Sequence, residues 1–128
     1  MPGSALSSRL LGRTNLAILA IMVATTTLPH GVIERIGEVL DPEEVWLFGS
    51  RARETHAADS DWDLMAVLAD TAADRQLDIA AVWADFRELR RMRIEVIPIR
   101  RRDFEENRDT LGELAEAVAR EGHVVYGR

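Results

Sequence analysis

The sequence predicts an α/β (α+β) domain, in which helices pack on a small mixed sheet of three to four strands. Two patterns indicate this fold class. Some segments repeat apolar residues at helical spacing, whereas others are short continuous apolar runs bounded by glycine, proline or acidic residues. The two kinds of segment alternate along the chain, which is the order expected when helices cover one sheet.

The first half of the domain is predicted to hold two strands. A helix over 31–40 has its apolar residues on one face and is ended by Pro42. The apolar run 45–48 predicts a buried strand, and the serine that opens 50–54 is placed to cap a short helix there. After a polar loop, 62–69 predicts a second buried strand.

The second half is predicted to begin with a long amphipathic helix over 71–92, acidic early and basic late, as the helix dipole favours. A third strand over 93–99 contains a proline, which is typical of an edge strand or a strand end. A last helix begins at Asp103 or Asp109 and ends before a glycine, and 124–126 predicts a short final strand.

Residues 1–29 differ from the rest of the chain. Arg9 and Arg13 precede the apolar run 16–24, an arrangement with a superficial likeness to a secretory leader. The run is too short to span a bilayer as a helix, so we expect no membrane partner. We favour an N-terminal apolar extension that packs on the domain or forms a homo-oligomer, with the domain itself over 30–128.

Composition excludes several kinds of site. The 128 residues are 47% hydrophobic and 30% charged, which suits one compact domain with a core. Cysteine is absent, which excludes disulfides, thiolate zinc sites and cysteine nucleophiles. All sixteen basic residues are arginine, so no lysine is available to clamp a phosphate. The net charge of −6 argues against direct nucleic-acid binding.

A pair of acids is the most informative feature of the chain. Gly49 and Ser50 follow the first strand, and Asp61 and Asp63 open the second. Residues two apart in a strand point to the same face, so the two carboxylates are predicted to project together, roughly 6.6 Å apart along the strand. Their mutual repulsion favours a bound divalent cation, and Mg²⁺ is the hard cation that commonly shares carboxylates with substrate phosphates.

A third acid lies in the next strand. Glu95 is the only acidic residue in an otherwise apolar run. If this strand lies beside the one that carries Asp61 and Asp63, Glu95 completes a three-carboxylate cluster. Such a cluster suits two metal ions that catalyse phosphoryl displacement. The alternative is that Glu95 faces solvent on an open edge, which is ordinary for a half-exposed strand.

The runs 48–53 (Phe-Gly-Ser-Arg-Ala-Arg) and 60–64 (Ser-Asp-Trp-Asp-Leu) resemble the signature of the DNA polymerase β-like nucleotidyltransferase superfamily. More narrowly, the chain is similar to the minimal nucleotidyltransferases of the antitoxin type. The resemblance covers about 31–128, with Glu95 where the third acid of the family falls, and it implies the polymerase β-like nucleotidyltransferase fold.

The resemblance implies transfer of AMP from ATP with two Mg²⁺ ions. Asp61 and Asp63 would hold the metals. Glu95 would bind one metal and help to deprotonate the acceptor hydroxyl. Because ATP is a cytosolic nucleotide, the resemblance also implies a cytoplasmic protein.

The same resemblance assigns the phosphates to the turn after the first strand. Gly49 and Ser50 would cradle the β- and γ-phosphates, and Arg51 or Arg53 would add positive charge. The chain departs from the family pattern at Glu54, where a glycine usually follows the second arginine.

The acceptor implied by the resemblance is a partner protein. It is a toxin of the higher-eukaryote-and-prokaryote-nucleotide-binding (HEPN) ribonuclease type, modified by adenylylation of a tyrosine, and the chain would be its antitoxin. Two alternatives stay open. The chain could be a binding module that masks its partner without catalysis, or a transferase acting on a small hydroxylated molecule.

Overall fold

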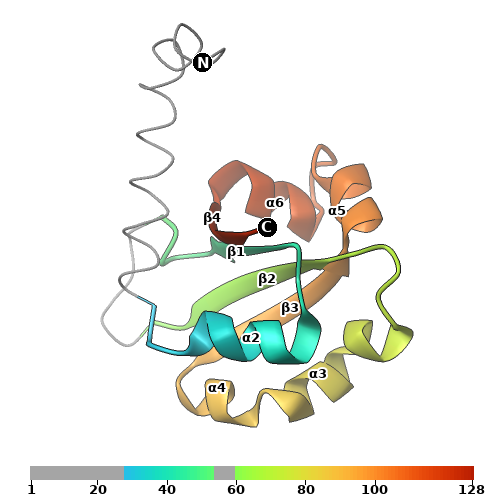
Figure 1. Ribbon diagram of the computed structural model, residues 1–128. Coiled ribbons are helices and arrows are strands. Elements are labelled where there is room, and N and C mark those ends of the chain that lie inside the picture. Colours follow the sequence, from blue (N-terminus) through green and yellow to red (C-terminus); the bar gives the residue numbers. More distant parts are fainter. Residues whose placement is uncertain (1–27, 54–59) are drawn as a thin grey trace, which may run out of the picture.

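The computed structural model describes residues 28–53 and 60–128. In chain order its elements are α2 (Val32–Leu40), β1 (Glu44–Phe48), β2 (Trp62–Leu68), the 3₁₀ helix η1 (Asp74–Leu77), α3 (Ile79–Asp85), α4 (Arg87–Arg91), β3 (Ile94–Arg100), α5 (Arg101–Asn107), α6 (Leu114–Glu121) and β4 (His123–Gly127). The sheet forms the middle of three layers, with α2, α3 and α4 on one face and α5 and α6 on the other (Figure 1).

The sheet has four strands in the order β3-β2-β1-β4. Strand β1 pairs antiparallel with β2 and β4, whereas β2 and β3 are parallel. The sheet is therefore mixed, and the predicted fold class is confirmed. Strand β3 lies at an edge and therefore pairs with one neighbour only. Pro98 has no N–H group to donate, and an edge strand tolerates it because no second neighbouring strand requires that hydrogen bond.

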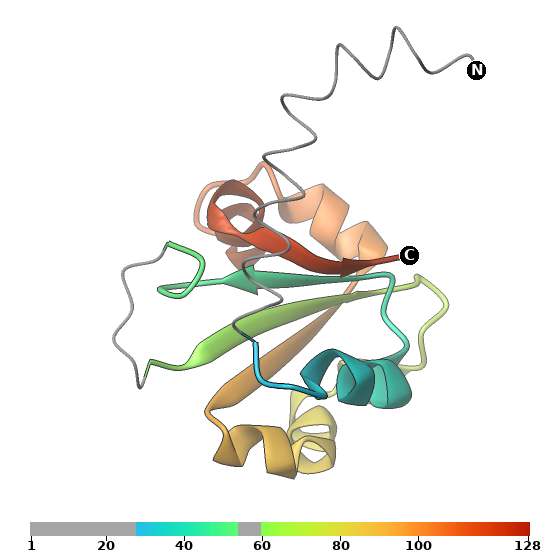
Figure 2. The ribbon, with the colours of Figure 1, turned by 60° about the vertical axis from the view of Figure 1, so that its left-hand side comes forward.

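Alternate side chains of the strands enter two separate cores. Leu64 of β2 and Val96 of β3 join the core under α2, α3 and α4, while Met65 packs in the core under α5 and α6. Figure 2 shows the sheet between these two groups of helices. The alternation that buries Trp62 in the first core sends Asp63 to the opposite face, as expected for a strand.

The long helix predicted over 71–92 is wrong, because the structure divides this segment into η1, α3 and α4. The division follows from a side chain that takes hydrogen bonds from backbone N–H groups, which a continuous helix would use for its own bonds. Asp78 ends η1 and caps α3 by accepting hydrogen bonds from the N–H groups of Ala80 and Ala81. At Phe86, which is buried, α3 ends and α4 begins.

The prediction of a single last helix is also wrong. Two helices, α5 and α6, occupy this segment, and α5 starts directly after β3 at Arg101. A turn separates them, and within it Gly112 has a φ of 92°. This left-handed conformation is open to glycine and interrupts a continuous helix.

Two of the predicted segments lie largely or partly outside the described residues. The extension 1–29 falls there except for its last two residues, so the division into extension and domain, and oligomerisation through the extension, stay predictions. The short helix predicted over 50–54 is a turn as far as residue 53. Among the helices of 28–53 and 60–128, none is long and apolar enough to cross a membrane.

Candidate active site at one end of the sheet

The turn after β1 places backbone directly against a carboxylate. Gly49 has a φ of 75°, and its carbonyl accepts hydrogen bonds from the N–H groups of Ala52 and Arg53 at 3.1 and 3.2 Å. A Cβ atom added to Gly49 would lie 2.5 Å from Oδ2 of Asp63. Only glycine therefore fits both the conformation and the space, and the Asp63 carboxylate lies over the turn.

The next strand brings a second carboxylate beside the first. Asp63 of β2 pairs in register with Glu95 of β3, and with Phe48 of β1 on its other side. Adjacent strands lie about 4.8 Å apart, so paired residues of one face are neighbours. Asp63 and Glu95 share the face covered further along by α5 and α6, where the apolar residues of β2 and β3 on that face pack. The carboxylates occupy the end that these helices leave open.

Asp61 lies immediately before β2 and belongs to the same region. Its carboxylate forms an ion pair with Arg93 at 3.9 Å, and both side chains are about two-thirds exposed. It lines a cavity together with Glu95. The three acids therefore lie at the same end of the sheet, with Glu95 exposed on the edge strand, and their role as metal ligands stays a prediction.

The surroundings of Asp63 disfavour its charged form. Burial is the main cause that raises the pKa of Asp63, and the negative charges of Glu95 and Asp61 raise it further. The guanidinium of Arg53 acts in the opposite direction. A bound cation would relieve both the desolvation and the repulsion, because it stabilises the charged carboxylate.

The acids do not form a closed metal cage. In the described part of the chain, no three His, Asp or Glu side chains stand close enough together to hold one metal ion. Mg²⁺ does not require such a cage, since it usually takes one or two carboxylates and completes its shell with substrate phosphates and water. The hard oxygen donors of Asp63, Glu95 and Asp61 fit this mode of binding.

The two arginines of the turn have different surroundings. Arg53 forms an ion pair with Glu121 of α6 at 2.9 Å and lies on the same face as Asp63. Arg51 instead donates hydrogen bonds to the carbonyl of Ser60 from Nε at 3.1 Å and Nη2 at 2.9 Å. Arg53 is thus the arginine positioned to add charge near the carboxylates.

The contacts of Arg51 join it to residues at the far end of the same loop. Its guanidinium stacks at 3.9 Å from the ring centroid of Trp62, which belongs to the core on the opposite face of the sheet. Together with the bonds to Ser60, this stacking ties the two ends of the loop that joins β1 to β2. Glu54, the departure from the family pattern, lies outside the described residues.

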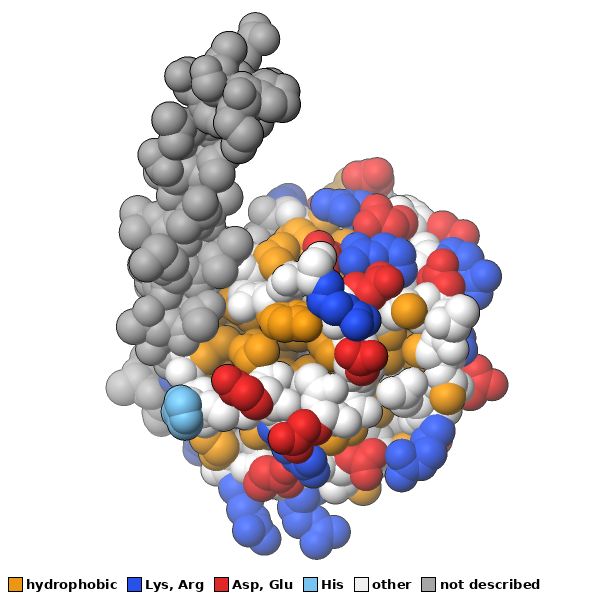
Figure 3. Space-filling view, in the orientation of Figure 1, with side chains coloured by type: hydrophobic (Ala, Val, Ile, Leu, Met, Phe, Trp, Pro, Cys, Tyr) orange, Lys and Arg blue, Asp and Glu red, His pale blue; other side chains and the backbone are white. Residues whose placement is uncertain are grey.

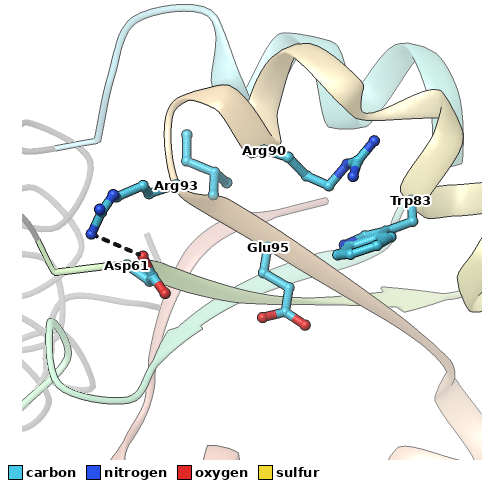
Figure 4. A pocket seen from close by; sticks show the side chains of 6 residues that line it. Asp61, Trp83, Arg90, Arg93 and Glu95 are labelled. Atoms are coloured by element: carbon cyan, nitrogen blue, oxygen red, sulfur yellow. Dashed lines mark ion pairs between the residues drawn. The ribbon is translucent and has the colours of Figure 1, made fainter.

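A cavity of about 240 Å³ opens at the edge of the sheet beside β3 (Figure 4). Figure 4 shows Glu95 between Asp61 and the indole of Trp83, with Arg90 and Arg93 on the side of the helices. Trp83 and Arg90 were not predicted from the sequence as site residues, because both fell within the one long amphipathic helix expected over 71–92. The available signal was a tryptophan on the polar side of that helix, where a large aromatic residue is unusual.

Three crystal structures resemble the chain in fold. A toxin–antitoxin with AMP-PNP shares 22% sequence identity over 76% of this chain and 71% of that chain, with a TM-score of 0.54. A mutant of the toxin–antitoxin MntA-HpeT shares 21% identity over the same fractions, with a TM-score of 0.52. A Sulfolobus solfataricus protein named as a nucleotidyltransferase shares 18% identity over 88% of this chain and 84% of that chain, with a TM-score of 0.50.

Among curated proteins, none matches the sequence. The family described as Polymerase beta, Nucleotidyltransferase matches residues 32–128, which span both halves of the sheet and the entire carboxylate cluster. This match agrees with the glycine turn, the paired acids and the mixed sheet. The resemblance inferred from the sequence is confirmed, and the chain belongs to the polymerase beta nucleotidyltransferase family.

Proposed function

We propose that the chain is a Mg²⁺-dependent nucleotidyltransferase that transfers AMP from ATP to a hydroxyl group of a partner protein. The observation that carries this proposal is the position of the Asp63 carboxylate, over the left-handed turn at Gly49 and in register with Glu95. This arrangement would put phosphates bound at the turn beside a pair of carboxylates that can act as hard oxygen ligands. Nucleotidyl transfer requires this combination.

In this proposal the chain's own groups have separate tasks. Gly49 and Ser50 hold the β- and γ-phosphates, and Arg53 adds positive charge. Asp61, Asp63 and Glu95 would hold two Mg²⁺ ions between them, and the bound metal would stabilise the negative charge that develops on the phosphate oxygens. The proximity of these groups orients the α-phosphate toward the acceptor.

Transfer forms a bond between the acceptor oxygen and the α-phosphorus. It breaks the bond between the α-phosphorus and the oxygen that bridges to the β-phosphate, and pyrophosphate leaves. Glu95, exposed on the edge strand, accepts the proton of the acceptor hydroxyl. An exposed carboxylate suits this role because a large acceptor can reach it.

The proposed partner is a HEPN-type toxin, with a tyrosine as the acceptor and this chain as the antitoxin in the cytoplasm. The fold likeness to two toxin–antitoxin structures, one of them with AMP-PNP, supports this assignment. A partner protein also suits a site at an open sheet edge.

The test is incubation of the chain with α-labelled ATP, Mg²⁺ and the protein encoded beside it. We expect label on the partner, and no label after chelation of Mg²⁺ or with Asp63→Asn. Asp109→Asn is the matched control, because it removes the same charge from the exposed turn between α5 and α6 and should transfer normally. Absence of label with the wild type, under conditions in which the partner binds, would refute the proposal.

One observation favours a second candidate, a binding module that masks its partner without catalysis. Asp61 pairs with Arg93, and the described acids form no closed metal site. Isothermal titration with Mg·ATP separates the two candidates. Binding of the partner without any binding of nucleotide would leave only the masking role.

A further inference from the structure

The cavity beside β3 joins the carboxylate cluster to a separate aromatic surface. Glu95 and Asp61 form one side of it, and Trp83 of α3 with Arg90 of α4 forms the other (Figure 4). The proposed transfer uses Glu95 but has no task for Trp83 or Arg90. These two residues come from the layer on the far face of the sheet, so the cavity wraps around the open sheet edge.

Trp83 is held in place by a cation and still presents its ring. The guanidinium of Arg90 lies 4.3 Å from the ring centroid, a distance at which a cation and an aromatic face attract each other. The tryptophan nevertheless remains 50% exposed. Within the described residues, Nε of Arg90 is buried and has no hydrogen-bond partner. A half-exposed aromatic ring that is held in one orientation at a cavity is typical of a recognition surface.

The size and charge of the cavity restrict its occupant. At about 240 Å³ it is smaller than the roughly 300–1,000 Å³ of pockets that enclose small-molecule ligands. It suits one large side chain. The chain as a whole carries a net charge of −6, which disfavours a long nucleic-acid strand. A protein side chain therefore fits better than a nucleic-acid strand.

Exposed arginines continue from the cavity along α4, and we call them the basic rim. Arg93 lines the cavity and pairs with Asp61, whereas Arg87 and Arg91 lie on α4 outside the lining of the cavity. Figure 3 shows basic side chains gathered at the lower end of the molecule, where α4 lies. This rim is complementary to acidic residues on either side of the inserted side chain.

We propose that this cavity receives the acceptor side chain of the partner, an aromatic residue with a hydroxyl group carried in an acidic segment. Its ring packs on Trp83, its hydroxyl points toward Glu95, and the acidic neighbours contact the arginines of α4. The inference rests on the proposed function and adds to it the place where the acceptor docks. Trp83 is then a residue that determines acceptor specificity.

The experiment measures transfer from labelled ATP to the protein encoded beside the chain, with the KM for each substrate determined separately. Trp83→Ala is expected to raise the KM for the partner about tenfold, as for an aromatic anchor at an interface, and to leave the KM for ATP unchanged. Trp83→Phe should recover most of the affinity, because the phenyl ring preserves the stacking surface. Ile79→Ala is the control, since Ile79 is 62% exposed one turn earlier on α3 and does not line the cavity.

A second variant tests the rim. Arg91→Glu is expected to raise the KM for the partner and to weaken its dependence on salt, because screened attraction between the arginines and an acidic segment is lost. Isothermal titration of the partner against the same variants gives affinities that do not depend on turnover.

The outcomes separate the two proposals. If the wild type labels the partner and Trp83→Ala has the same KM for it, the docking inference is overturned while the proposed function stands. If the wild type labels nothing, the proposed function fails and this inference falls with it. A rise in the KM for ATP with Trp83→Ala would also overturn the inference.

Discussion

Replacing Gly49 with alanine tests the contact on which the candidate site depends. The φ of 75° at this position disfavours any residue with a Cβ atom, by about 1–2 kcal/mol. The added Cβ would also lie 2.5 Å from Oδ2 of Asp63, which is about 0.9 Å inside the 3.4 Å at which ordinary contact begins. The Asp63 carboxylate or the turn must therefore move by nearly 1 Å.

These two effects act on different measurements. Backbone strain lowers the free energy of unfolding, whereas displacement of Asp63 lowers the rate of transfer. A misplacement of about 1 Å in a catalytic constellation reduces the rate by roughly a hundredfold. We therefore expect Gly49→Ala to lose about 1–2 kcal/mol of stability and roughly two orders of magnitude in kcat/KM.

Gly112→Ala is the matched control. Gly112 has a φ of 92°, and a Cβ there meets no atom within 4 Å. It should lose a similar free energy of unfolding, measured by urea denaturation, and keep full transfer activity. Equal loss of activity in both variants would mean that stability alone limits turnover. Full activity in Gly49→Ala would refute the reasoning that the turn positions Asp63.

Three further predictions concern stability. Asp78→Ala should lower the free energy of unfolding by about 1 kcal/mol, measured by urea denaturation, because the cap of α3 is removed. The hydrogen bond from Arg53 lowers the pKa of Glu121, so the stabilisation from this pair is complete above the ordinary glutamate pKa of 4.5. It is lost as the pH falls through the lower pKa of the folded state, and thermal melts from pH 7 to 3 should therefore show a smaller loss for Glu121→Gln. Arg51→Ala should lower the free energy of unfolding by about 1 kcal/mol, because the hydrogen bonds to the carbonyl of Ser60 are lost. It should also speed proteolysis of the loop between β1 and β2, and an unchanged cleavage rate would contradict the role of Arg51 in holding that loop.

Local patterns in the sequence were enough to predict the strands and the acids that stand at their ends. Apolar runs that end at a glycine or begin with acidic residues predicted the bounds of β1, β2 and β3 to within a residue or two. A strand that is buried on both faces must be apolar along most of its length, which makes such a run easy to recognise. The two-residue period of a strand placed Asp63 opposite to Trp62. Both inferences depend only on local periodicity.

Register and helix breaks were decided by the tertiary structure. The pairing of Asp63 with Glu95 needs β2 and β3 to be parallel neighbours, which no local pattern specifies. The long helix predicted over 71–92 broke at Asp78, because a cap and the packing of Phe86 outweighed a continuous amphipathic pattern.

The cavity beside β3 also exists only in three dimensions. Trp83 and Glu95 are twelve positions apart in the chain and belong to different layers, and they meet because a short crossover returns the chain to the sheet edge. Local sequence encodes which side chains are buried and which are charged. Long-range packing decides which of the exposed ones become neighbours, since that depends on how the layers close around the sheet.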